Sequence, residues 1–215
     1  MVRKIRALGS VSYSAAIESA SCPDVGRELS DFARRVEREA TRRGAAQARQ
    51  IVVIGDGVAW IWKTAEYLFP GALCIVDRFH AKQHLSELSH ALFGDSPKAQ
   101  EWAHRRYEEL DGGRMDDLLK EIGLSASCVP EAEQCRTYFQ NNRERMRDPE
   151  FRARGLCTSS GLVEAGCKSI VGGRLKTSGM HWSVSGANAI LGLRCTIKSG
   201  RYESFWERNA SQWAA

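Results

Sequence analysis

Two short apolar runs separated by a helical pattern stand out along the chain. IVVIG at 51–55 and ALCIV at 72–76 are rich in β-branched residues, which favours buried strands. Between them, residues 58–68 have apolar side chains at helical spacing, and the FPG triplet at 69–71 ends that helix. A strand–helix–strand unit of this length predicts a right-handed crossover between neighbouring parallel strands.

Helical patterns account for most of the remaining chain. Residues 25–46 and 80–93 have the spacing of amphipathic helices, and a further helix is predicted at about 184–198. The stretch 95–150 is acidic, has helical spacing and contains no strand pattern, which predicts an all-helical insertion. Together these patterns predict an α/β fold in which a helical insertion interrupts the core.

Composition restricts the class of protein. The 215 residues, 43% hydrophobic and 27% charged, have the mixture typical of a globular chain. No run of 18 apolar residues occurs, and the start MVRKIRALGS lacks the apolar region of a signal peptide, which favours a cytoplasmic protein that does not enter the membrane. Seven cysteines occur without a CxxC pair, which favours free thiols over a disulfide framework or a zinc knuckle.

The net charge of +5 is unevenly distributed. Residues 51–150 contain 12 Lys and Arg against 17 Asp and Glu, whereas residues 151–215 contain nine against three. A basic segment is typical of a polyanionic partner, because clustered Lys and Arg release counterions from phosphates. A solvated basic face is the alternative.

An aspartate follows each predicted strand. Asp56 follows the run 51–55 and Asp77 follows the run 72–76. Both should lie at the carboxyl ends of adjacent parallel strands, where open α/β sheets bind their ligands. Carboxylates at this edge suit Mg²⁺, which prefers oxygen ligands. The alternative for each aspartate is a helix N-cap.

His80 and His84 add two further interpretations of the second strand end. Asp77 could orient the His80 imidazole across the first turn of a helix. The i, i+4 spacing of His80 and His84 can also bind zinc, but the chain offers no HExxH glutamate and no third ligand near them apart from Asp77.

Glu164 is the third candidate carboxylate, in a helix that Ser159 or Ser160 would cap. A partner for the helix dipole is one interpretation. The other is a metal ligand beside a phosphate backbone, because the residues that follow are basic over a stretch without another acid. Trp182 could belong to the core or stack next to DNA.

Three motifs carry a resemblance to a known family. VVIGDGVAWIW, FPGALCIVDRFHAKQHL and SSGLVEAGCKSIVGGRLKTSGMHWS-x-x-GANAILGLR resemble bacterial insertion-sequence transposases of the DDE superfamily, most closely the ISKra group, with similarity to the ISL-type and Mutator-like groups. The resemblance covers about residues 5–208. It implies an RNase H-like fold and Mg²⁺- or Mn²⁺-dependent cleavage and transfer of DNA strands at the element ends.

The resemblance assigns roles residue by residue. Asp56 matches the second catalytic aspartate and Glu164 the catalytic glutamate, both as metal ligands, while Asp77 and His80 match the (C/D)xxH signature. The partner implied is double-stranded DNA, bound by an oligomer of the intact protein in the bacterial cytoplasm, at the nucleoid. The residues expected to contact DNA are Lys168, Arg174, Lys176, Trp182 and Arg194.

The resemblance also implies an order of segments along the chain. Residues 1–94 would form a partial RNase H-like core, 95–150 the helical insertion, and 151–215 the catalytic helix and a basic DNA-contacting segment. Residues 10–17 resemble the last strand of the family's N-terminal hairpin, and Asp24 lies outside any strand pattern. We therefore expect the chain to lack the first two strands, their aspartate and the DNA-binding domain, and to have little activity alone.

Two alternatives to a catalytic core stay open. One is a noncatalytic DNA-binding fragment that uses residues 168–201 on phosphates and modulates a full-length transposase. The other is a pseudogene product without a stable fold. Salt-dependent DNA binding separates these two, because only a real phosphate interface gives a steep salt dependence.

Overall fold

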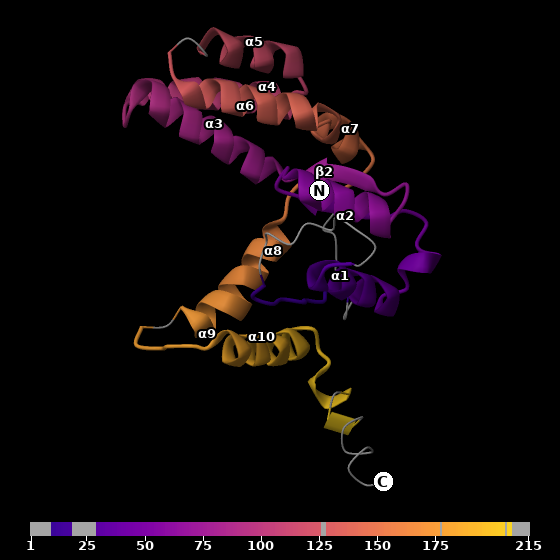
Figure 1. Ribbon diagram of the computed structural model, residues 1–215. Helices are drawn as coiled ribbons and strands as arrows, with labels where there is room; N and C mark the ends of the chain where they lie inside the picture. Colours follow the sequence, from indigo (N-terminus) through magenta and orange to yellow (C-terminus); the bar gives the residue numbers. More distant parts are fainter. Residues whose placement is uncertain (1–9, 19–28, 126–127, 177, 205, 208–215) are drawn as a thin grey trace. The chain divides into compact units, whose positions relative to one another are not determined.

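The computed structural model describes residues 10–18, 29–125, 128–176, 178–204 and 206–207 (Figure 1). The chain forms two compact units. One is continuous and spans Gln47–Ser160. The other combines the described residues up to Ala46 with those from Gly161 onward. Each unit is described separately below.

A parallel strand pair forms the centre of the continuous unit. Strands β1 (Val52–Gly55) and β2 (Leu73–Val76) pair in parallel, with Val52 opposite Leu73 and Gly55 opposite Val76. Helix α2 (Ala59–Leu68) connects them and buries Trp62 and Ala65. The predicted strands, the crossover helix and the parallel pairing are therefore confirmed.

Helices make up the rest of this unit. They are α3 (Arg78–Phe93), α4 (Pro97–Asp111), α5 (Met115–Ser125), α6 (Pro130–Asn142), the 3₁₀ turn η2 (Arg143–Arg145) and α7 (Asp148–Ala153). Ser96 caps α4 through the Ala99 amide, ahead of Pro97 at the first helical position. No strand occurs in the described residues of 95–150, which confirms the prediction of an all-helical stretch.

One hydrophobic core joins this helical stretch to the strand pair. Helices α3, α4, α5 and α6 pack side by side (Figure 1). Val76 of β2 and Leu85 of α3 share a buried cluster with Leu118 of α5 and Phe139 of α6. The helices after residue 95 therefore do not have a core separate from that of β2 and α3.

The second unit is helical in its described residues. Its elements are α1 (Asp31–Arg42), the 3₁₀ turn η1 (Ala45–Gln47) at the junction of the units, α8 (Gly161–Gly166), the π-helix η3 (Cys167–Gly172), α9 (Gly173–Leu175) and α10 (Val184–Lys198). Ile170, Leu191 and Cys195 form its buried core, against which Tyr13 packs. Within the predicted helix at 25–46, residues 25–28 lie outside the described part, and the helix begins only after the Ser30 cap.

The predicted strand at 10–17 is wrong, because side chains rather than a neighbouring strand satisfy its backbone. The Tyr13 amide donates to Ser199 Oγ at 2.9 Å. The Ile17 amide donates to Asn188 Oδ1 at 2.6 Å, and Asn188 Nδ2 donates back to the Ile17 carbonyl at 3.0 Å. The Asn188 amide thus replaces the pair of bonds that a strand would supply.

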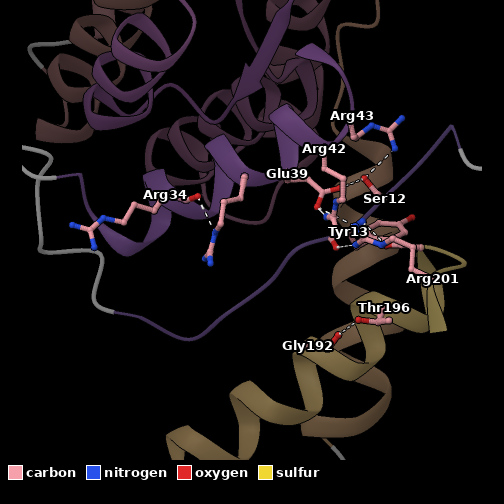
Figure 2. A network of polar contacts seen from close by, with 11 residues as sticks. Ser12, Tyr13, Arg34, Glu39, Arg42, Arg43, Gly192, Thr196 and Arg201 are labelled. Atoms are coloured by element: carbon pink, nitrogen blue, oxygen red, sulfur yellow. Dashed lines mark hydrogen bonds and ion pairs between the residues drawn. The ribbon is translucent and has the colours of Figure 1, made fainter. Parts of the chain in front are cut away.

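A charged network also fixes this segment. Figure 2 shows Glu39 of α1 accepting from the Ser12 hydroxyl and forming ion pairs with Arg42 and Arg201. Arg43 donates to Ser12 Oγ at 3.1 Å and to the Ser10 carbonyl at 2.8 Å. The network joins residues 10–13, α1 and the chain after α10 within one unit.

The compact units do not coincide with the expected segments 1–94, 95–150 and 151–215. That order, which belongs to an RNase H-like arrangement, stays a prediction.

None of the helices in the described residues combines the length and apolar character needed to cross a membrane. Five cysteines in the described part are free thiols: Cys74, Cys135, Cys157, Cys167 and Cys195.

Candidate functional site

The two strand-end aspartates lie at the same edge of the strand pair, as predicted. Gly55 and Val76 are the last residues of their strands and lie opposite each other. Asp56 and Asp77 follow directly, and the Asp77 amide donates to the Gly55 carbonyl at 2.7 Å. Parallel strands thus bring together two carboxylates that are 21 positions apart in the chain.

Asp77 is an N-cap, one of the alternatives that the sequence left open. One carboxylate oxygen accepts from the Phe79 amide at 2.9 Å and caps α3. The other accepts from the Ser160 amide at 3.0 Å and from the Ser160 hydroxyl. Because Asp77 is only 5% exposed, these three bonds offset the cost of burying its carboxylate.

The histidines after Asp77 contact each other and an aromatic side chain. The His80 and His84 rings meet edge-on with centroids 5.3 Å apart, and the His84 ring lies 4.1 Å from that of Tyr138. Burial lowers the pKa of His84, and the neighbouring His80 lowers it further, partly offset by Glu87 and Asp56. His84 is therefore held in its neutral form at neutral pH.

Neither the orientation of His80 by Asp77 nor zinc binding by His80 and His84 gains support from the described contacts. Both oxygens of Asp77 accept from Phe79 and Ser160, so no hydrogen bond in the described structure supports Asp77 as the orienting group of His80. Across the described residues, no group of three His, Cys, Asp or Glu side chains is placed to hold a metal ion.

Asp56 differs from Asp77 because its backbone is more firmly held than its carboxylate. The half-buried side chain accepts one hydrogen bond within the described residues, from the Val58 amide at 3.1 Å to Oδ1. Its carbonyl accepts from Tyr138 Oη at 2.8 Å. Burial raises the pKa of the Tyr138 phenol, and Asp56 and Asp77 raise it further, so the phenol keeps the proton that it donates.

The sequence did not indicate that three side chains far along the chain decide these environments, although Ser160 was expected to cap the helix that contains Glu164. Tyr138 and Asn142 of α6 and Ser160 after α7 reach the strand ends from more than 80 positions away. Asn142 Nδ2 donates to the Gly57 carbonyl at 3.1 Å. The i, i+4 spacing of Tyr138 and Asn142 on a helix was visible, but their target was not.

An open pocket borders the Asp56 turn. Its volume is about 1340 Å³, and its lining includes Gly57, Trp62, Tyr138, Asn142 and Arg145. The Arg145 guanidinium lies 5.0 Å from the centroid of the Trp62 ring. The lining mixes acidic, basic and amide groups, so its chemistry favours no single class of ligand.

Glu164 belongs to the other compact unit, on α8, where its side chain is exposed. The predicted approach of Glu164 to Asp56 therefore stays a prediction. Lys168, Arg174 and Lys176, all exposed, follow it along the same helical stretch. A π-helix lies between Glu164 and Arg174, and π-helical segments are often found at functional sites.

Trp182 and Arg194 have internal contacts in this unit. The Arg174 guanidinium lies 5.6 Å from the Trp182 ring centroid, and the buried indole N–H has no acceptor in the described part of the chain. Arg194 donates to the Ile170 carbonyl at 2.9 Å and to the Ser169 carbonyl. Arg194 thus stabilises the π-helix, and its contact with DNA stays a prediction.

Together these features define a mixed α/β protein with a parallel strand pair. At the end of that pair, the Asp56 carboxylate accepts a single hydrogen bond within the described residues. The chain belongs to a family described as Uncharacterised protein family (UPF0236), whose family model matches residues 18–210. No curated protein and no solved structure matches the chain.

Proposed function

We propose that this chain is the catalytic-core part of a DDE-type insertion-sequence transposase with an RNase H-like fold. The observation that carries the proposal is Asp56, a half-buried carboxylate at the end of a parallel strand whose side chain accepts one hydrogen bond within the described residues. The resemblance of the three sequence motifs supports the same assignment. The reaction would be cleavage and transfer of DNA strands by phosphoryl transfer.

Asp56 and Glu164 would hold Mg²⁺ or Mn²⁺. Asp56 fits this role because Val58 engages only one of its two oxygens within the described residues, and Mg²⁺ sites often use one or two carboxylates together with substrate phosphates. A divalent ion there supplies charge stabilisation to the attacking and leaving oxygens. Asp77 fits a supporting role better, since its oxygens are already engaged.

The DNA partner is proposed from the basic residues that follow Glu164. Lys168, Arg174 and Lys176 are exposed, and residues 151–215 contain six more basic than acidic side chains. These residues would bind phosphates of double-stranded DNA, with Trp182 held beside Arg174. The intact protein would act as an oligomer in the bacterial cytoplasm, associated with the nucleoid.

The strand pair supports the further proposal that additional strands complete the sheet. Val52, Val53 and Ile54 of β1 are only half-buried although all three are apolar. Purely parallel sheets are normally covered on both faces, and an isolated pair of strands is marginally stable. An added strand beside β1 would also supply the first aspartate of the family's metal site.

The test is Mg²⁺-dependent nicking of DNA carrying the element ends. We expect little nicking by the 215-residue chain and restored nicking by a longer chain that includes the upstream strands. Glu164→Gln and Asp56→Asn should abolish nicking in the longer chain, whereas Glu66→Gln, which alters an exposed glutamate on α2, should leave it intact. Nicking that survives Glu164→Gln would refute the proposal.

A noncatalytic DNA-binding fragment is the second candidate, and the basic excess of residues 151–215 favours it. Binding to element-end DNA should weaken steeply with salt, by about 0.9 in log K per log salt for each phosphate neutralised. Lys168→Gln and Lys176→Gln should each reduce that slope, and Lys63→Gln in the continuous unit should not. Binding without nicking in the longer chain would favour this candidate.

A further inference from the structure

Helix α6 reaches the Asp56 turn with two side chains that lie one helical turn apart. Tyr138 Oη donates to the Asp56 carbonyl at 2.8 Å, and Asn142 Nδ2 donates to the Gly57 carbonyl at 3.1 Å. Residues four apart lie on the same face of a helix. Two successive carbonyls of the turn are therefore held by one rigid element.

Asn142 is itself fixed in orientation. Its Nδ2 also donates to the Tyr138 carbonyl at 3.1 Å, and its Oδ1 accepts from Trp62 Nε1 at 3.0 Å. An indole N–H can only donate, which determines which end of the amide faces Trp62. The side chain is 3% exposed, and buried polar groups are costly to leave unpaired.

Gly57 allows α6 to approach this closely. Its φ is +102°, and a Cβ built there would lie 2.5 Å from the Tyr138 ring. Glycine meets both requirements, since it tolerates positive φ and leaves room for the ring. The Tyr138 ring therefore blocks movement of the turn toward α6, while the two hydrogen bonds oppose movement away from it.

We propose that Tyr138 and Asn142 are positioning residues for Asp56. Both donate to backbone carbonyls and neither bonds to a carboxylate oxygen of Asp56, so they fix where the carboxylate lies without occupying it. This inference rests on the proposed function in one respect, namely that Asp56 is a ligand for a divalent ion. It assigns the helical stretch after residue 95 a direct part in the site.

Two measurements on the 215-residue chain test the proposal. Amide hydrogen exchange at Val58 reports the geometry of the turn, because this amide donates to Asp56 Oδ1. Titration with Mn²⁺ alone, followed by its electron spin resonance signal, reports the affinity of the ion. The variants are Tyr138→Phe, which keeps the ring, and Asn142→Asp, which keeps the acceptor for Trp62 but replaces the donor.

The matched control is Tyr107→Phe. Tyr107 lies on α4 in the same unit, partly buried against the same core, with Lys82 5.1 Å from its ring centroid. The Leu88 amide of core helix α3 serves as the internal reference for global unfolding.

Tyr138→Phe should speed exchange at Val58 about tenfold, as the loss of one hydrogen bond would, without changing exchange at Leu88. It should weaken Mn²⁺ binding about tenfold, the lower end of the effect of removing an outer-shell partner. Asn142→Asp should act in the same direction. Tyr107→Phe should change neither quantity.

The outcomes separate this inference from the proposed function. Unchanged Val58 exchange in both Tyr138→Phe and Asn142→Asp would overturn the positioning role. Faster exchange with unaltered Mn²⁺ affinity would also overturn it, provided that Asp56→Asn weakens binding. If Asp56→Asn leaves Mn²⁺ affinity unchanged while Tyr138→Phe still speeds exchange, the turn is held as described but Asp56 is not a metal ligand.

Discussion

The ends of β1 and β2 have the same local design but different bonding. Each is a strand followed by an aspartate whose carboxylate accepts from the amide two residues later. At β2 the Asp77 carboxylate is buried and accepts two further bonds from Ser160. At β1 the Asp56 carboxylate is half-exposed, and the bonds from α6 go to the backbone instead.

This difference indicates how a structural aspartate and a candidate ligand can be distinguished. A carboxylate whose oxygens are both occupied by buried donors contributes mainly to stability. A carboxylate whose backbone is fixed while one oxygen has no partner within the described residues is suited to bind something else. Three substitutions in the Asp56 and Asp77 turns, one at Ser160 and one at the further carboxylate Asp148 test the distinction.

The largest expected effect follows from Gly57→Ala. Positive φ costs a nonglycine residue about 1–2 kcal/mol, and forcing a methyl group against the Tyr138 ring costs about 1–3 kcal/mol more. Gly71→Ala, before β2, is the control, because Gly71 also has positive φ (+81°) but no atom of the described residues lies within 4 Å of its added Cβ. Urea unfolding should show the full loss only for Gly57→Ala. Equal losses would mean that α6 does not press on the Asp56 turn.

Asp77→Ala should destabilise the chain by about 2–4 kcal/mol. The substitution removes a helix cap, worth about 0.5–2 kcal/mol, and leaves the Ser160 donors without their acceptor. Asp56→Ala removes one bond at a half-exposed site and should cost under about 1 kcal/mol. The urea midpoints of the two variants measure these losses. A larger loss of stability in Asp56→Ala than in Asp77→Ala would contradict the assignment of Asp77 as the structural aspartate.

Ser160→Ala should have a smaller effect, about 1 kcal/mol, because it removes the hydroxyl donor and keeps the amide bond to Asp77. Thermal unfolding of Ser160→Ala in the wild-type and Asp77→Ala backgrounds measures the coupling. Since the hydroxyl acts through Asp77, its loss should matter only in the wild-type background.

Asp148 extends the comparison of Asp56 and Asp77 to another buried carboxylate. One of its oxygens, Oδ1, has no partner in the described structure. Burial raises its pKa above the ordinary value of 3.8; the Thr158 hydroxyl, Arg152 and Arg78 oppose the shift, and Asp111 adds to it. Because the folded state binds this proton more tightly than the unfolded chain, the stability that Asp148 contributes is present below about pH 3.8 and is lost as pH rises through the raised pKa.

Asp148→Asn should therefore remove this pH dependence and leave stability at pH 7 unchanged or higher by under about 1 kcal/mol. Urea unfolding from pH 3.5 to pH 7 checks both effects. A clear loss of stability at pH 7 would show that the Asp148 charge is compensated as fully as that of Asp77.

Local patterns predicted much of the fold. The spacing of apolar residues gave the strands within one residue of β1 and β2, and the helix 58–68 within one residue of α2. The segment 10–17 had an acceptable strand pattern but pairs with no strand among the described residues. Its backbone bonds go to Ser199 and Asn188, which lie 186 and 171 positions away, and no local pattern contains that information.

For the candidate site, the sequence predicted the position of the two aspartates but not the bonding of their carboxylates. The parallel crossover predicted from the sequence placed Asp56 and Asp77 at one edge of the sheet, where they lie in the structure. Whether each aspartate was a cap or a ligand depended on Ser160 and Tyr138, which lie 83 and 82 positions away. The sequence therefore located the edge of the sheet, while the environment of each carboxylate required the tertiary structure.

The division of the chain into a continuous unit and a unit built from both flanks has a consequence for biosynthesis. Residues 47–160 can form their core as soon as they leave the ribosome, because every contact within that unit lies inside the same stretch. Residues 10–18 are made earlier but must wait, since their partners Asn188 and Ser199 are translated only after residues 47–160. During that delay Tyr13 and Ile17 lack their native hydrogen-bond partners, so the segment at 10–18 can form its native contacts only after α10 and Ser199 have been made.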